Sequence, residues 1–202
     1  MTPRRYDLGK RADSVAETQR RILEATFKLH NEQGVAATTI PEVARRADVA
    51  LGTVYKHFPT VDALVTACGG HVMALIKPPG PDTFVGVEAL PDRISKLVHE
   101  LFAMYERGAR QIAVARCEQD EVPALKAFVQ QDARGHEQLL RLALGRDRLA
   151  APELRAVLAL TDFYIWKAFS EKRVPKQQAA EIITAAVLAK ITGATARKGT
   201  TQ

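Results

Sequence analysis

The sequence predicts an all-α fold of about nine helices. Apolar residues recur at helical spacing along most of the 202-residue chain, and no alternation of apolar and polar residues persists long enough to indicate strands. The segment from Lys77 to Leu90 contains three prolines and two glycines, which excludes regular helix and predicts a loop. With 47% hydrophobic and 26% charged residues, the chain can bury a core in one or two domains.

The stretch from Thr39 to Phe58 predicts two short helices joined by a tight corner. Thr39 suits an N-cap, Glu42 completes a capping box, and Pro41 falls in the first turn, where its missing N–H costs nothing. The first helix ends near Ala47, and its apolar stripe is Ile40, Val43, Ala44 and Ala47. Asp48 then predicts the corner, because aspartate tolerates the left-handed conformation.

The second helix, Leu51 to His57, predicts a surface suited to a DNA groove. Val54 and Phe58 are expected to be buried. The remaining side chains are small, hydroxylated, aromatic or basic, and they comprise Gly52, Thr53, Tyr55, Lys56 and His57.

These residues resemble the DNA-binding domain of the TetR family of bacterial transcriptional regulators. The resemblance covers about the first third of the chain, and its residues are Ile22, Leu23, Ala25, Leu29, Gly34, Thr39, Ile40, Val43, Ala44, Ala47, Val49, Gly52 to Tyr55, Phe58, Pro59, Ala63 and Leu64. Asp48 stands where the family usually has Gly, Ala50 where a Ser would cap the helix, and Leu51 where Lys is common. The missing cap and charge predict weaker local phosphate binding.

The expected DNA contacts divide into two groups. Thr39, Tyr55, Lys56 and His57, with Arg45 and Arg46, are expected to hold phosphates. Gly52 and Thr53 are expected to read bases, and Leu51 to contact a thymine methyl group.

The domain organisation follows from the same resemblance. We expect a helix-turn-helix domain at residues 15–62 and a helical regulatory and dimerisation domain at residues 63–195, with flexible tails at 1–14 and 196–202. The basic N-terminal tail would either enter the minor groove as an arm or stay a solvated tail. A long helix from Val15 to Gly34 packs across the two short ones, and His30 in it is interpreted as a core histidine with a hydrogen bond.

A fourth helix, Val61 to about Ile76, contains Gly69 and Gly70. Paired glycines inside a helix indicate close packing, which we favour, or a hinge. Three further helices are expected at 91–108, 109–118 and 123–144. The last two, at 152–171 and 175–191, are strongly apolar and predict the homodimer surface, and the resemblance implies a four-helix bundle there.

A ligand site is harder to derive. Asp132 and His136 interrupt an apolar stripe four residues apart, which indicates a mutual ion pair, an interface pair or polar anchors of a pocket. The candidate ligand residues are Phe102, Tyr105, Cys117, Phe128, Asp132, His136, Phe163 and Trp166, and for the aromatic ones core packing is the competing role.

Several classes of protein are disfavoured. Glycine-rich phosphate loops, GxSxG and HExxH motifs and dense ligand spacings are missing from the sequence, so we predict no enzyme, cofactor or metal site. Cys68 and Cys117 lack CxxC spacing and are interpreted as reduced core residues. Without an apolar run long enough to span a membrane or a secretory leader, we expect a cytoplasmic protein with no membrane partner.

The sequence therefore predicts a regulator that binds a palindromic double-stranded DNA operator as a homodimer and is released by a small-molecule effector. The net charge of +6 permits a polyanionic partner, and the resemblance favours repression over activation. The alternative is a dimeric ligand-binding or adaptor protein whose DNA-binding head is weak or vestigial, which would bind DNA weakly and without sequence preference.

Overall fold

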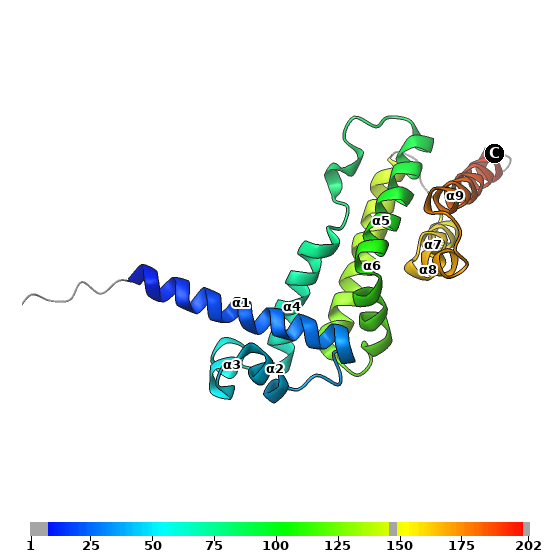
Figure 1. Ribbon diagram of the computed structural model, residues 1–202. Helices are drawn as coiled ribbons and strands as arrows, with labels where there is room; N and C mark the ends of the chain where they lie inside the picture. Colours follow the sequence, from blue (N-terminus) through cyan, green and yellow to red (C-terminus); the bar gives the residue numbers. More distant parts are fainter. Residues whose placement is uncertain (1–7, 146–148, 200–202) are drawn as a thin grey trace, which may run out of the picture. The chain divides into compact units, whose positions relative to one another are not determined.

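A computed structural model describes residues 8–145 and 149–199, and in these ranges the chain is helical, without strands (Figure 1). The α-helices are α1 Leu8–Gln33, α2 Ile40–Ala47, α3 Leu51–His57, α4 Val61–Ile76, α5 Leu90–Glu118, α6 Pro123–Leu144, α7 Ala151–Leu160, α8 Phe163–Glu171 and α9 Lys176–Gly199. A short 3₁₀ helix, η1 Pro81–Phe84, lies in the predicted loop. The all-α prediction is confirmed.

The chain divides into two compact units. The first holds residues 1–72 and 113–129, and the second holds residues 73–112 and 130–202. Helices α4, α5 and α6 each contribute residues to both units. The predicted functional boundary at residue 62 stays a prediction.

The first unit is built around α1, with α2 and α3 beside it (Figure 1). Its core joins the apolar stripe of α1 to that of α2 and to the two residues that anchor α3. The buried members are Ile22, Ala25, Leu29, Ile40, Val43, Ala44, Ala47, Val54, Phe58 and Leu64. The predicted three-helix packing is therefore confirmed, including full burial of Val54 beneath α3.

Two predicted tails are shorter than expected. Helix α1 begins at Leu8 rather than Val15, since residues 10–14 contain no proline or glycine and Gly9 does not stop the helix. Helix α9 continues to Gly199, past residue 191, where the predicted helix ended, and past residue 195, where the predicted tail began. Residues 1–7, with Arg4 and Arg5 of the proposed arm, and residues 200–202 lie outside the described part of the chain.

The predictions for His30 and the cysteines are only partly correct. His30 is half-buried rather than fully in the core, and no hydrogen bond to its ring is found within the described ranges. Burial lowers the pKa of His30 from 6.5 to about 4, against the opposing attraction of the Glu118 carboxylate. Cys68 is buried, and burial raises the pKa of its thiol to about 11. Cys117 is exposed, so its assignment to the core was wrong.

The glycine pair in α4 is not explained by close packing. A methyl group at Gly69 would make an ordinary contact with the Phe128 ring at 3.8 Å, and one at Gly70 would meet no atom within 4 Å. The favoured close-packing interpretation is therefore wrong, and the hinge stays a hypothesis.

Helix α5 joins two predicted helices. The predicted break falls at Gly108, where the backbone is non-helical (φ −115°, ψ 17°) but the helix resumes at once. A methyl group at Gly108 would lie 2.5 Å from Ile76 Cγ2, so this position has no room for a side chain. Glycine is required here by the approach of α4 to α5 within the second unit.

The predicted helix at 152–171 is broken, and this prediction was wrong. Helix α7 ends at Leu160 and α8 begins at Phe163. Asp162 is the cause, because its carboxylate accepts the Tyr164 N–H at 2.9 Å and caps α8. Both helices contact α9 within the second unit, while the dimer surface assigned to these helices stays a prediction.

Among the described residues, no single helix is both long and apolar enough to cross a membrane. The segments 51–57 and 61–84 reach the required length and hydropathy only when they are taken together, and the chain bends between them.

Two glycine substitutions should change stability in opposite directions. Gly108→Ala forces a methyl group against Ile76 and should lower the free energy of unfolding by about 1–3 kcal/mol. Gly135→Ala, inside α6 and facing open space, should raise it by about 0.5–1 kcal/mol. Urea unfolding of both variants measures the difference, and a stabilising Gly108→Ala would contradict the packing argument.

His30 should make stability depend on pH. Below pH 6.5 the unfolded chain binds a proton on this ring, whereas the folded protein binds it only near pH 4. The free energy of unfolding should therefore fall by about 3 kcal/mol between pH 7 and pH 4 from this group. His30→Phe should flatten this part of the pH profile, and urea unfolding at a series of pH values measures it; an unchanged profile would contradict the assignment to His30.

Candidate nucleic-acid interface

Helix α2 begins with the predicted capping box. The Thr39 hydroxyl oxygen accepts the Glu42 N–H at 3.4 Å, and Glu42 Oε2 accepts the Thr39 N–H at 3.0 Å. The bond that the Thr39 hydroxyl donates to the Glu42 carboxylate, and after it the bond from the Thr39 N–H, lowers the pKa of Glu42. Gln33 Nε2 also donates to this carboxylate, at 3.2 Å. The start of α2 is therefore fixed by side chains from before the helix, Gln33 and Thr39, and by Glu42 in its first turn.

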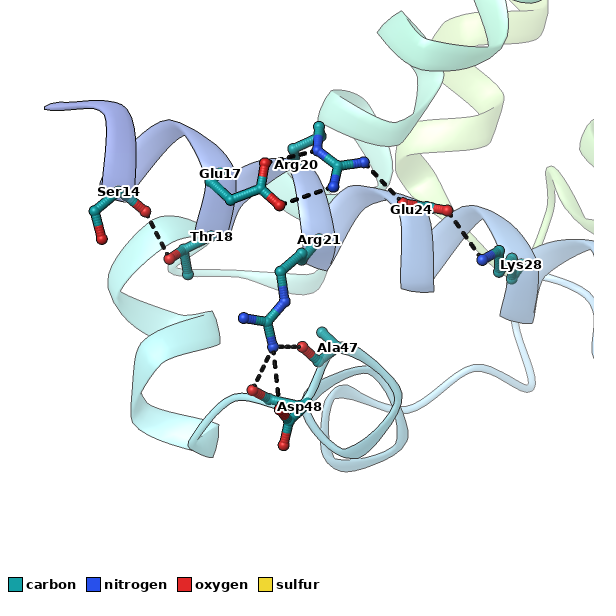
Figure 2. A network of polar contacts seen from close by, with 9 residues as sticks. All are labelled: Ser14, Glu17, Thr18, Arg20, Arg21, Glu24, Lys28, Ala47 and Asp48. Carbon is teal, nitrogen blue, oxygen red and sulfur yellow. Dashed lines mark hydrogen bonds and ion pairs between the residues drawn. The ribbon is translucent and has the colours of Figure 1, made fainter. Parts of the chain in front are cut away.

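The corner between α2 and α3 depends on Asp48. Its backbone is left-handed (φ 53°, ψ 55°), as predicted. Arg21 of α1 holds this corner, because its Nη2 donates to the carbonyl oxygens of Ala47 and Asp48, the latter at 2.6 Å (Figure 2). The Asp48 carboxylate adds a longer contact to the same nitrogen at 3.5 Å. The sequence analysis missed Arg21, since its partners are 26 and 27 residues away.

Helix α3 presents a solvent-facing surface of mixed chemistry. Leu51 is 45% exposed and Tyr55 47% exposed, while Val54 and Phe58 on the opposite side are in the core. Gly52 and Lys56 are also exposed, and Thr53 and His57 are half-buried. Ala50 precedes the helix without a side-chain cap, as predicted. The structure therefore brings the predicted α3 residues together on one solvated face.

The two arginines of α2 differ in their surroundings. Arg46 forms a two-pronged ion pair with Glu32 of α1, at 2.8 and 2.5 Å. The hydrogen bonds that Arg46 donates to Glu32 lower the pKa of Glu32 and raise the pKa of Arg46. Arg45 is exposed, and within the described ranges no hydrogen bond or ion pair engages its side chain. Of these two arginines, Arg45 is the more open to an added anion, although its charge also acts on the Glu42 carboxylate.

The exposed side of α1 carries charges that pair with one another. Arg20 donates to Glu17 at 2.8 Å and to Glu24 at 3.0 Å, and Lys28 donates to Glu24 at 2.9 Å (Figure 2). Two cations and two carboxylates sum to zero. This chain of pairs therefore adds no positive field next to the α3 surface.

The predicted ligand residues are divided between the two units. Cys117 and Phe128 belong to the first unit, where Cys117 is exposed and Phe128 is half-buried next to Gly69. The other six belong to the second unit. Asp132 and His136 are both half-buried in α6, and His136 Nε2 lies 2.8 Å from the hydroxyl oxygen of Thr161.

Four of the five aromatic candidates form one ring cluster in the second unit. Tyr105, Phe163 and Trp166 contact each other with ring centroids 5.5–6.1 Å apart, and Phe102 lies 6.5 Å from Tyr105. Tyr105, Phe102 and Phe163 are at most 2% exposed. Tyr105 donates to the Thr161 carbonyl oxygen at 3.0 Å, so the break between α7 and α8 supplies the polar partner of this core. Thr161 was not among the predicted residues, because its partners come from α5 and α6.

The first unit has the geometry of a helix-turn-helix DNA-binding domain. Two short helices meet at a left-handed corner, the first is capped at both ends, and the second exposes one face. Residues 22–68 match the model of the bacterial regulatory proteins of the tetR family. This part of the chain is therefore similar in sequence to the DNA-binding domain of that family.

Named relatives share this part of the chain. The transcriptional repressor KstR of Mycolicibacterium smegmatis is 44% identical over 64 residues, which are 31% of this chain and 30% of KstR. The transcriptional regulator HbdR of Aromatoleum sp. strain CIB is 30% identical over 89 residues, 44% of this chain and 38% of HbdR. The chain thus aligns with less than half of the length of these curated relatives, and they are transcriptional regulators.

Solved structures share the fold over most of the chain. The multidrug binding protein EbrR, complexed with imidazole, is similar with a TM-score of 0.61 and 24% identity, over 92% of this chain and 96% of that one. A TetR transcriptional regulator from Rhodococcus sp. RHA1 gives a TM-score of 0.51 and 24% identity, over 88% and 97%. The N-terminal helix-turn-helix and C-terminal helical architecture is therefore that of TetR-like structures.

Removing Arg21 should loosen the corner before α3. Arg21→Ala leaves the α2 carbonyl oxygens without their donor and should lower the free energy of unfolding by about 1–2 kcal/mol. Arg20→Ala, one position earlier, removes surface pairs only and is the matched control. Thermal unfolding measures both, and equal melting temperatures for the two variants would contradict the role of Arg21.

Proposed function

We propose that the protein is a DNA-binding transcriptional repressor that acts as a homodimer on an inverted-repeat operator. The observation that carries the proposal is the exposed face of α3, held outward by the burial of Val54 and Phe58. A helix presented this way fits a major groove, and two copies related by a two-fold axis would read half-sites about 34 Å apart. The repressors and regulators that share this domain support the same role.

The proposed contacts follow the exposure of the α3 and α2 side chains. Tyr55, Lys56 and Arg45 are exposed and would hold phosphates, with His57 at the end of α3. Thr39 already binds Glu42, and Arg46 already binds Glu32. A phosphate would have to replace a carboxylate at these two residues, so they would contribute less binding free energy than the exposed residues. Gly52 and Thr53 would read base edges, and Leu51 would meet a thymine methyl group.

A dimer and an effector complete the proposal. The dimer would form through residues 152–171 and 175–191, where Tyr164 and Ile182 are 53% and 45% exposed. A small molecule that binds a conformer with the wrong spacing of the two α3 helices would release DNA. The ring cluster and the polar group at Thr161 and His136 are the proposed place for it. The similar fold of EbrR, a multidrug binding protein, is consistent with such a site.

Selection of bound fragments from a random DNA pool tests this function. The selected sequences should contain an inverted repeat with half-site centres about one helical turn apart. Weak binding without sequence preference would instead indicate the alternative, a dimeric adaptor or ligand-binding protein with a vestigial head.

Substitutions on α3 should separate phosphate contacts from base contacts. Lys56→Ala should reduce the slope of log affinity against log salt by about 0.9 per head, or about 1.8 per dimer. Thr53→Ala should chiefly relax base preference, and Tyr55→Ala should weaken binding to all sequences alike.

Lys126→Ala is the matched control for Lys56→Ala, because it removes an equally charged, exposed side chain from α6. It should leave the salt slope as it is in the unmodified protein. A slope that changes equally in both lysine variants would contradict the assignment of Lys56.

A further inference from the structure

A single carboxylate binds the backbone that leads into the helix-turn-helix. Glu118 is the last residue of α5, and its Oε2 accepts the N–H groups of Val35 and Ala36, both at 2.8 Å. These amides are 83 and 82 residues away in sequence and lie in the connection between α1 and α2. Donor and acceptor belong to the same compact unit.

Gly34 is the residue that lets the carboxylate approach. Its φ is +91°, which side chains rarely adopt, and its N–H donates to the His30 carbonyl oxygen at 3.1 Å to end α1. A methyl group here would also collide with Glu118 Oε1. Backbone conformation and the position of Glu118 therefore both require glycine at this site.

Apolar packing holds the same connection from its other side. Val35 is 8% exposed and belongs to a small core cluster with Val65, Ala115, Val122 and Leu125. Ala115 precedes Glu118 by one helical turn, so the last turn of α5 contacts this connection with an apolar and a charged side chain.

The connection is then bonded continuously to the start of α2. The Thr38 N–H donates to the Val35 carbonyl oxygen at 3.1 Å, and the Thr38 hydroxyl to the Gly34 carbonyl oxygen at 2.6 Å. Thr39 follows directly and caps α2 with Glu42. A shift of Val35 and Ala36 must therefore move the beginning of α2 or break these bonds.

We propose that Glu118 is a positioning residue for DNA recognition, which sets the orientation of α2 and α3 by clamping the amides of Val35 and Ala36. This inference rests on the proposed function. A carboxylate suits the role, because one ionised oxygen can accept two neighbouring N–H groups in strong, short bonds. Since α5 belongs to both compact units, a change in its last turn would reach α2 through this clamp.

The test compares Glu118→Ala and Glu118→Gln with Glu121→Ala, a matched control at an exposed carboxylate three residues further on. Glu118→Gln keeps an acceptor oxygen and nearly the same volume, so it tests the charge in a protein that keeps its packing. Three measurements apply to each variant: amide hydrogen exchange, melting temperature, and selection from a random DNA pool with variable half-site spacing.

We expect exchange of the Val35 and Ala36 amides to accelerate by about 10-fold or more in Glu118→Ala, and less in Glu118→Gln. Operator affinity should fall by about 10-fold in Glu118→Ala, with the half-site sequence unchanged and a wider range of spacings accepted. Glu121→Ala should match the unmodified protein in all three measurements.

Faster exchange combined with unchanged affinity and unchanged spacing would overturn the positioning role. If the variants lose operator affinity only in proportion to their loss of melting temperature, and still select the same half-site spacing, Glu118 contributes to stability alone. If the Val35 and Ala36 amides exchange at the same rate in both Glu118 variants as in the unmodified protein, the clamp of these amides by Glu118 is overturned. If the unmodified protein selects no operator, the proposed function and the positioning role both fail, and the exchange data still report the clamp.

Discussion

Arginine side chains close the carboxyl ends of three helices, and each comes from another helix. The last carbonyl groups of a helix lack partners and concentrate partial negative charge. A guanidinium group brings positive charge and several N–H donors in one plane, so it can bind two such carbonyls. The pairs are Arg21 with Ala47 and Asp48 after α2, Arg107 with Ile76 and Lys77 after α4, and Arg93 with Leu142 and Ala143 near the end of α6. A left-handed residue terminates each helix at that point, namely Asp48, Lys77 and Gly145.

The arginine at the end of α2 matters most for the next helix, α3, which has seven residues and lacks a side-chain cap. An isolated helix shorter than about 12 residues is marginal in water, so α3 must take its stability from its surroundings. Its two anchors, Val54 and Phe58, fix the side that faces the core. The corner held by Arg21 fixes where α3 starts. Asp48 in this corner has a left-handed backbone, which costs free energy in a residue other than glycine. An exposed surface on so short a helix can therefore be rigid before any DNA binds, which reduces the entropy lost on binding.

The sequence was informative where the interactions are local. The capping box of Thr39 and Glu42, the left-handed Asp48 and the apolar stripe of α2 all involve residues within one or two turns, and each was predicted. Arg21 and Glu118 were missed because their backbone partners are far away in sequence. The sequence alone does not distinguish a charged side chain in water from one that binds such a distant backbone group. The break before Phe163 had a local signal, Thr161 followed by Asp162, but the surrounding apolar periodicity outweighed it. The ligand residues were chosen by type, and ring contacts that cross from α5 to α8 cannot be read from spacing.

Several cations of the first unit are already bound within the protein. The net charge is +6, but Arg46 binds Glu32, the exposed cations of α1 bind Glu17 and Glu24, and Arg21 is spent on carbonyl groups. Arg45 and Lys56 are exposed, and the charge of Arg45 also acts on the Glu42 carboxylate, whose pKa it helps to lower. Two cations per head supply only a modest sequence-independent attraction to phosphates. In the proposed complex, discrimination would come from short-range fit between a groove and the hydroxyl of Thr53, the phenol of Tyr55 and the apolar side chain of Leu51. The affinity of such an interface would depend on the angle at which α3 is held, so the proposal gives the bonds that orient α2 and its corner a role in recognition as well as in stability.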